Sequence, residues 1–295
     1  MLQRRWQILV SIIAMVACDN DNLALQESNT KEFFNAHSLS IENEHVADRS
    51  LLGTISTVFT ANIHGGTSGS AIAWEKRENT FAQYIINIGS PRILILHEIT
   101  YYQVASLKAA LMAKGTEYLY SSVCKSNVAT SNLGTAILSK NSWQVDPYCV
   151  PFEKSSMVRA QVLGLWVIGF HSGDPNDIQT AAYHLLFSPG AAVIGGDFNQ
   201  PPRSSHMDLM YSFGTDIYER SDALYPTSRI RLSGYVPCPP ASDATEKIDY
   251  LFYKGMAPPT GLITSPPGTM TSAYDWCGGA SYTTDHKAVR AVFVH

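Results

Sequence analysis

The sequence predicts an α/β fold in which two β-sheets pack face to face and helices lie on the outside. Apolar runs of strand length outnumber the segments with helical spacing. Several of these runs follow one another without a helix between them, so the strand–helix alternation of a simple Rossmann fold is not supported. Hydrophobic residues make up 45% and charged residues 16% of the 295 positions, which is typical of a globular core with a lightly charged surface.

The first half of the expected domain begins with a strand at 57–63, followed by a loop rich in Gly and Ser at 65–70. Residues 74–88 place their apolar side chains at helical spacing, so a helix is expected there. The other segments expected in this half are a strand at 93–96, a helix at 104–114 and strands at 118–123 and 133–139.

In the second half, the turn-forming run Asp174–Asp177 is expected to cap a helix at 178–187. The strands expected here are 159–161, 165–170, 191–196, 248–253 and 288–294. Residues 258–284 are dense in Pro, Gly, Ser and Thr, which indicates a long surface loop. No internal repeat or second domain is indicated, so residues 51–295 are expected to form a single catalytic domain.

The N-terminal segment has the pattern of a secretory signal. Arg4 and Arg5 precede an apolar run that ends at Ala17, so residues 1–17 are expected to be a signal peptide. The run is too short for a stable membrane span. Cys18 resembles a bacterial lipoprotein cleavage site, which leaves a plain signal peptide and a lipid anchor both open. The polar residues 18–50 are expected to be an extension, and the protein to be secreted or periplasmic.

Export changes how the cysteines are interpreted. Four cysteines remain besides Cys18, and an even number in an exported protein predicts two disulfides with three possible pairings. The nearest-neighbour pairing, Cys124–Cys149 and Cys238–Cys277, is favoured. The spacing fits no Cys/His zinc site.

The net charge of the chain is −4. Removal of Arg4 and Arg5 with the signal would leave 19 basic residues against 25 acidic ones, a net charge near −6. This balance argues against tight non-specific binding of nucleic acid. The acidic net charge is still compatible with a few local basic residues that bind a phosphodiester transiently.

A carboxylate and an amide follow the apolar run 191–194. The Gly195-Gly196 pair marks a strand end where the backbone approaches something closely. Asp197 and Asn199 are two residues apart, so on an extended backbone their side chains point the same way and Phe198 points to the other face. Such a pair suits the binding of a metal ion, a water molecule or a phosphate.

Polar residues also occur at the ends of several other expected strands, and Asp249 lies inside the expected strand 248–253. Any one of them alone would be a satisfied buried polar group or a turn former. Together they would cost several kcal/mol if their charges were uncompensated, and a bound divalent cation would resolve this. The set comprises Asn62, Glu98, His171, Asp197 with Asn199, Asp249, and Asp285 with His286. Asn62, Glu98 and Asp285 carry the hard oxygen ligands that Mg²⁺ or Ca²⁺ prefers.

This ordered series resembles the motifs of the endonuclease/exonuclease/phosphatase superfamily over residues 55–295. The family includes deoxyribonuclease I, inositol polyphosphate 5-phosphatases, bacterial sphingomyelinases and the nuclease subunit of cytolethal distending toxin. The resemblance implies a four-layer α/β sandwich, deoxyribonuclease I-like, with two mixed sheets and the active site at one rim. Ala61-Asn62 and His97-Glu98 depart from the Trp-Asn and Gln-Glu of many members.

The resemblance also implies roles for the metal-binding and proton-transferring residues. Glu98, with Asn62 and Asp285, would hold Mg²⁺, or Mn²⁺ or Ca²⁺, on a phosphate oxygen. His286, oriented by Asp249, would be a base or a phosphate contact, and Asp197 is the alternative base for the attacking water.

The remaining roles concern the phosphate and the leaving group. Asn199 would bind phosphoryl oxygens, and His171 would stabilise the developing charge or protonate the leaving oxygen. Arg159 is a candidate phosphate contact, with a solvated strand arginine as the alternative. Arg77, Arg92 and Arg203 are further candidate cations for DNA.

The expected function is that of a secreted Mg²⁺-dependent phosphodiesterase, foremost an endonuclease with DNA as substrate. The loop 65–70 resembles that of the toxin nuclease subunit, which favours DNA and would allow toxin-type partner subunits. A phospholipid or phosphoinositide phosphoesterase is the alternative, for which Tyr274-Asp275-Trp276 could contact a membrane. A non-catalytic binding protein of the same fold is the second alternative, although the chain retains all the charged groups of the site.

Overall fold

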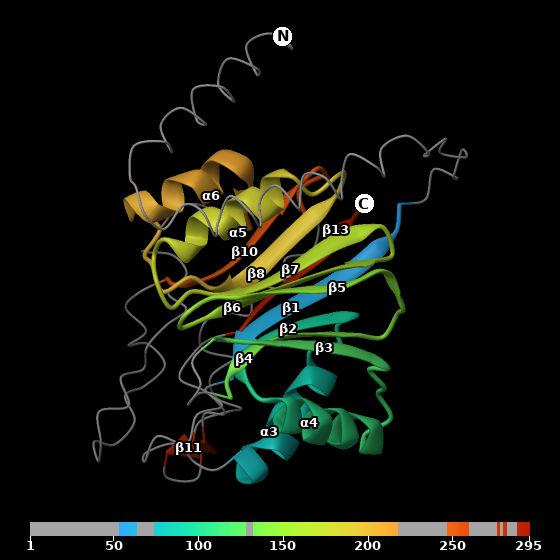
Figure 1. Ribbon diagram of the computed structural model, residues 1–295. Helices are drawn as coiled ribbons and strands as arrows, with labels where there is room; N and C mark the ends of the chain where they lie inside the picture. Colours follow the sequence, from blue (N-terminus) through green and yellow to red (C-terminus); the bar gives the residue numbers. More distant parts are fainter. Residues whose placement is uncertain are drawn as a thin grey trace, which may run out of the picture. The chain divides into compact units, whose positions relative to one another are not determined.

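Two β-sheets stacked face to face form the centre of the computed structural model (Figure 1). The structure describes residues 53–63, 74–127, 132–217, 247–259, 276–277, 280–281 and 288–295. The first sheet has the order β13 (Val289–Val294), β1 (Ile55–Asn62), β2 (Ile93–Ile99), β4 (Gly134–Ser139) and β3 (Tyr120–Lys125). The second has the order β5 (Trp143–Pro151), β6 (Ser156–Val162), β7 (Leu165–His171), β8 (Ala192–Asp197), β10 (Asp249–Lys254) and β9 (Thr215–Asp216).

Both sheets are mixed. Strands β1 and β2 are parallel, as are β7 and β8, while the other neighbours within these two sheets are antiparallel. Strands β2 and β8 are nearly continuous apolar runs because both of their faces are covered. A short antiparallel pair, β11 (Trp276–Cys277) and β12 (Ala280–Ser281), lies outside the two sheets.

Helices cover the outer face of each sheet and complete four layers (Figure 1). Helices α3 (Trp74–Asn87) and α4 (Tyr101–Ala113) pack on the first sheet. Helices α5 (Asp177–Leu186) and α6 (Asp208–Phe213), the latter preceded by a 3₁₀ turn at Ser205–Met207, pack on the second. Apolar side chains fill all three interfaces, and those between the sheets include Ile95, Val193 and Leu251. The predicted four-layer α/β sandwich is therefore confirmed.

The observed elements differ from the expected ones in several places. Helix α6 with its 3₁₀ turn and strand β9 were not expected, and β11 and β12 lie within the segment 258–284 that was expected to be a surface loop. Strand β5 was not expected; it is an edge strand with mostly exposed or half-buried side chains and irregular pairing around Val145. Strand β6 begins at Ser156 rather than 159. Helix α4 begins at Tyr101 rather than 104, because Thr100 caps it.

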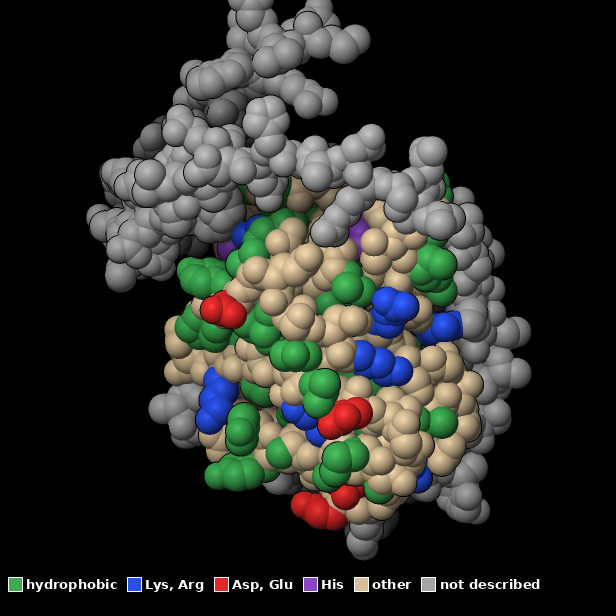
Figure 2. All heavy atoms as spheres, turned by 90° about the vertical axis from the view of Figure 1, so that its right-hand side faces the viewer, with side chains coloured by type: hydrophobic (Ala, Val, Ile, Leu, Met, Phe, Trp, Pro, Cys, Tyr) green, Lys and Arg blue, Asp and Glu red, His purple; other side chains and the backbone are tan. Residues whose placement is uncertain are grey.

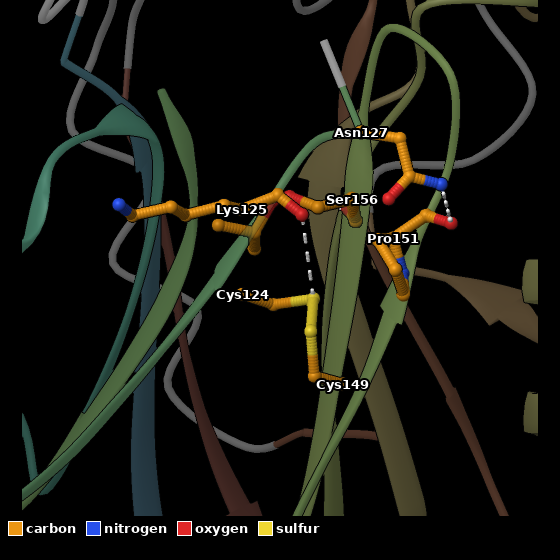
Figure 3. Close-up of a disulfide and its surroundings, with 7 residues drawn as sticks. Cys124, Lys125, Asn127, Cys149, Pro151 and Ser156 are labelled. Atoms are coloured by element: carbon orange, nitrogen blue, oxygen red, sulfur yellow. Dashed lines mark hydrogen bonds between the residues drawn. A yellow bond between two sulfur atoms is a disulfide. The ribbon is translucent and has the colours of Figure 1, made fainter. Parts of the chain in front are cut away.

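A disulfide joins the two sheets at one edge of the sandwich (Figure 3). Cys124 on β3 of the first sheet is bonded to Cys149 on β5 of the second. Beside it, Asn127 donates hydrogen bonds from its backbone N–H to Phe152 O (2.8 Å) and from its side-chain amide to Pro151 O (3.3 Å). The first of the two predicted cysteine pairs is confirmed. The second lies outside the described residues, because neither Cys238 nor the side chain of Cys277 is described.

Gly196 is required where β8 passes β7. A Cβ at this position would lie 1.8 Å from the backbone oxygen of Phe170, so no side chain fits without backbone movement. The close approach that the Gly195-Gly196 pair predicts is therefore present. We expect Gly196→Ala to lower the free energy of unfolding by about 3 kcal/mol, measured by urea denaturation.

Gly115 offers the matched control. It has a positive φ of 79°, but a Cβ added there would have no other atom within 4 Å, so Gly115→Ala adds only backbone strain of about 1 kcal/mol. Equal losses for the two variants would contradict the steric explanation.

Residues Leu52–His295 form one compact unit. The expected signal peptide, Cys18 and the polar extension at 18–50 lie outside the described residues. Among the helices of the described part of the chain, none combines the length and the apolar character needed to cross a bilayer.

Candidate active site

Polar residues from both sheets meet at one edge of the sandwich. Parallel strands end at the same edge, so the ends of β1 and β2 lie together, as do those of β7 and β8. Strand β1, blue in Figure 1, runs from right to left, which places this edge on the left. The residues at the strand ends are Asn62 on β1, Glu98 on β2, His171 on β7 and Asp197 on β8, and Asp249 begins the antiparallel β10.

The opposite edge has a different surface. Figure 2 looks onto it and shows basic, acidic and hydrophobic side chains interspersed. Ile55 at the start of β1 pairs there with Val294, and the Ser56 hydroxyl lies 2.9 Å from His295 Nε2.

His171, Asp197 and Asp249 occupy one row across three neighbouring strands, since Asp197 pairs with the other two in register. A Cβ on Gly195 would lie 3.0 Å from Ile95 of the first sheet, and one on Gly169 would lie 2.8 Å from it. Side chains two residues apart in a strand share a face. His171 and Asp197 therefore point toward the space between the sheets, where Asn62 and Glu98 of the first sheet meet them.

The Asn62 side chain links the carboxylates of the two sheets. Its Nδ2 donates hydrogen bonds to Glu98 Oε1 at 2.9 Å and to Asp197 Oδ2 at 3.0 Å. Asn62 is fully buried and Asp197 is 1% exposed, so these bonds form away from bulk water. Carboxylates only accept hydrogen bonds, which requires the amide nitrogen on this side. Asn62 therefore fixes the position of both acids.

His171 completes a group of three potential metal ligands. Its Nε2 lies 3.6 Å from Glu98 Oε1 and 3.9 Å from Asp197 Oδ2. One ligand atom from each of these residues lies within 4.8 Å of the others. Two hard carboxylates and an imidazole fit a divalent cation, whose charge would offset that of the two acids.

The predicted metal ligands are only partly those of this group. Glu98 is a member, and Asn62 contacts two members through its amide nitrogen rather than its oxygen. Asp285 lies outside the described residues. The structure adds His171 and Asp197, for which the sequence predicted acid–base roles.

A β-bulge places Glu98 in the site. The register of β2 against β4 shifts between His97 and Ile99, and Glu98 has a positive φ of 52°. A non-glycine residue in this region is uncommon, and such strain is concentrated at functional sites. The bulge places two consecutive side chains near the site. Glu98 accepts a hydrogen bond from Asn62. The buried His97 has its Nε2 2.8 Å from Thr60 Oγ1, and the centroid of its ring lies 6.4 Å from that of the His171 ring.

Asn199 holds the end of β8. Its backbone N–H donates to Asp197 Oδ1 at 2.9 Å, and its Nδ2 donates to the Ser172 carbonyl at 2.7 Å. Its φ of 50° is a left-handed conformation that Asn tolerates. Asn199 therefore orients Asp197 and, through its hydrogen bond to Ser172, links the segment after β8 to the segment after β7. Phosphate binding by Asn199 stays a prediction, and the role of the Ser172 carbonyl had no signal in the sequence.

Tyr250 ties the start of β10 to the same region. Its hydroxyl lies 2.7 Å from Gln200 O and 2.9 Å from Lys247 O. Buried Lys247 in turn forms an ion pair with Asp216 at the end of β9. These contacts fix the backbone on both sides of the Asp197–Asp249 pair. The only signal for Tyr250 in the sequence was its place beside Asp249, so no role was predicted for it.

Arg159 does not belong to this cluster. It alternates along β6 with Val158, which packs between the sheets, so Arg159 points to the outer face of the second sheet, the face that α5 and α6 cover. Its guanidinium carbon lies 3.9 Å from the centre of the Trp166 ring, and burial lowers its pKa to about 10. At 3% exposure it is not a solvated strand arginine either. The position does not support the predicted phosphate contact.

Two of the other candidate cations are not exposed beside the strand-end cluster. Arg77 is buried and donates a hydrogen bond to Ile63 O at 2.6 Å. Arg92 precedes β2 and lies at the opposite edge. Arg203 is exposed and follows Asn199 by four residues. Asp285, His286, the 65–70 loop and the side chains of Tyr274, Asp275 and Trp276 lie outside the described residues.

The profile of the Endonuclease/Exonuclease/phosphatase family matches residues 59–286. The chain belongs to this family. The match begins within β1 and includes every other strand of the two sheets except β13. Family membership makes the strand-end cluster the candidate active site of a phosphoesterase. The family resemblance predicted from the sequence is confirmed.

Solved structures of family members share the fold at low sequence identity. A family protein from Bacteroides vulgatus has a TM-score of 0.60 at 16% identity, over 82% of this chain and all of that one. TDP2 from D. rerio, solved with a single strand DNA product, has a TM-score of 0.60 at 14% identity over 82% and 100%. TDP2 from C. elegans has a TM-score of 0.58 at 18% identity over 90% and 81%. No curated protein sequence matches this chain.

Proposed function

We propose that the chain is a Mg²⁺-dependent phosphodiesterase that cleaves DNA. The observation that carries the proposal is the convergence of Glu98, His171 and Asp197 at one edge, with their ligand atoms within 4.8 Å of one another. The single strand DNA product bound to D. rerio TDP2 supports nucleic acid as the substrate class.

The residues of the site suit in-line hydrolysis of a phosphodiester. When bound, Mg²⁺ would act as a Lewis acid that polarises a phosphate oxygen. Asp197, held by Asn62 and by the Asn199 N–H, is positioned to orient the attacking water and accept its proton. His171, whose side chain is 16% exposed, would donate a proton to the leaving oxygen only where Glu98 and Asp197 hold the ion without it, because an imidazole bound to the ion through Nε2 has no proton there to give.

A panel of phosphoesters tests this function. The purified protein is incubated with supercoiled plasmid, a single-stranded oligonucleotide, sphingomyelin or inositol phosphates, each with Mg²⁺ or with EDTA. We expect nicking or cleavage of DNA that EDTA abolishes. Preferential release of phosphocholine or of inositol-linked phosphate would replace DNA by a lipid or inositol substrate. Hydrolysis of none of them would favour a binding protein.

We also propose that the protein is exported. The Cys124–Cys149 disulfide between the sheets supports an oxidising compartment, and the pattern at residues 1–17 supports a signal peptide. The mass of the mature protein, recovered from its native host, distinguishes cleavage with lipidation at Cys18 from cleavage alone. An unprocessed N-terminus with reduced cysteines would contradict export.

A further inference from the structure

Two neighbouring tyrosines are exposed at the start of α4. Tyr101 is 64% exposed and Tyr102 is 82% exposed, the two highest values among the large hydrophobic residues described as exposed. Their ring centroids lie 6.1 Å apart at an interplanar angle of 80°, an edge-to-face contact. The rings therefore form a small aromatic surface on the outside of the protein.

This surface lies close to the candidate metal ligands. Tyr101 follows Glu98 by three residues, so its Cα is at most about 11 Å from that of Glu98. Helix α4 starts directly after β2 ends, which places Tyr101 and Tyr102 at the edge of the sandwich where the site lies. An extended ligand bound at Glu98 can reach them.

The helix end that carries the tyrosines is fixed by other residues. Thr100 Oγ1 accepts a hydrogen bond from Gln103 N at 3.2 Å, and Gln103 Oε1 accepts one from Thr100 N at 2.8 Å. Val104 and Leu107 anchor the helix in the core. The tyrosine rings are therefore not needed to form α4, and their exposure is not explained by packing.

We propose that Tyr101 and Tyr102 stack against an unpaired base of the nucleic acid strand whose phosphate occupies the site. This inference rests on the proposed function and specifies its substrate as single-stranded. Every base has a π-face, so stacking on aromatic side chains binds single strands with little sequence preference. A protein with a net charge of −4 gains little from general attraction to phosphates, which makes stacking the suitable source of affinity.

The test compares base-containing and abasic substrates. One single-stranded oligonucleotide is prepared with normal bases and one with tetrahydrofuran abasic residues flanking the scissile phosphate. For Tyr101→Ala/Tyr102→Ala we expect KM for the normal strand to rise ~10-fold with little change in kcat. KM for the abasic strand should not change. Tyr101→Trp/Tyr102→Trp should restore a low KM.

Tyr148→Ala is the matched control, because Tyr148 is 53% exposed on β5 and distant in sequence from Glu98. Equal KM increases on both strands, or none on either, would overturn the stacking proposal. An unchanged KM accompanied by loss of binding to phosphatidylcholine vesicles would assign the tyrosines to a lipid surface and also overturn it.

Binding in EDTA separates this proposal from the proposed function. Fluorescence anisotropy of a labelled oligonucleotide should show about 10-fold weaker binding for the double alanine variant. If the wild-type protein cleaves the abasic strand, but the wild-type protein and the double alanine variant bind the labelled oligonucleotide equally well, the phosphodiesterase function is supported and the stacking proposal is overturned. If the double alanine variant binds the oligonucleotide more weakly but the wild-type protein hydrolyses no phosphodiester, the stacking proposal is supported and the phosphodiesterase function is overturned.

Discussion

Asp197→Asn is expected to lower kcat for DNA cleavage by ~10³-fold, the typical contribution of a positioned general base. The substitution keeps the size of the side chain but removes the charge and the proton-accepting capacity. Asp197 Oδ2 accepts a hydrogen bond from Asn62 and Oδ1 accepts one from the Asn199 N–H. An asparagine would turn its own NH₂ toward one of these two donors.

The same conflict predicts a moderate effect on stability. An unsatisfied donor facing a donor in a buried site costs about 1–2 kcal/mol, so Asp197→Asn should unfold at slightly lower urea concentration than the wild-type protein. Initial rates and urea denaturation are measured on the same samples. Asp174→Asn is the control, because Asp174 is an exposed acid beyond the end of β7. If Asp197→Asn kept more than a tenth of the wild-type kcat, Asp197 would not be the base.

The strands that carry the site could be predicted because they are buried on both faces. In β2 and β8 the covering helices and the opposite sheet demand an almost continuous apolar run, and the run ends at a polar residue where the site begins. Positions such as Glu98 and Asp197 are therefore visible in the sequence. The edge strand β5 gives no such signal, because its side chains are mostly exposed and Pro147 interrupts it.

The geometry within the site could not be predicted in the same way. The bulge at Glu98 depends on the pairing of β2 with β4, and nothing in the sequence His97-Glu98-Ile99 marks it. The position of Arg159 could not be predicted for a related reason. Both faces of β6 are buried, so the sequence of β6 shows no alternation of apolar and polar residues that would indicate which face of the sheet Arg159 points to. The Trp166 ring that covers Arg159 comes from the neighbouring strand β7.

Glu98→Gln is expected to remove most of the metal affinity while leaving the metal-free protein as stable as before. Gln keeps an oxygen that can accept the hydrogen bond from Asn62 Nδ2, so the link between the sheets can persist. It removes one of the two carboxylates that face the same amide, which also relieves their mutual repulsion. We therefore expect an unchanged or slightly raised Tm in EDTA.

Titration with Mg²⁺ or Mn²⁺ then separates metal binding from catalysis. An ion present at 100 times its Kd stabilises the folded state by about 2.7 kcal/mol, so the wild-type Tm should rise with metal concentration. For Glu98→Gln this rise should be lost, and kcat at saturating substrate should fall ~10²-fold. Glu153→Gln, an exposed acid in the β5–β6 turn, should retain both. A metal-dependent Tm rise that survives Glu98→Gln but disappears in His171→Ala would shift the ion toward the second sheet, because only Glu98 among the three clustered ligands comes from the first.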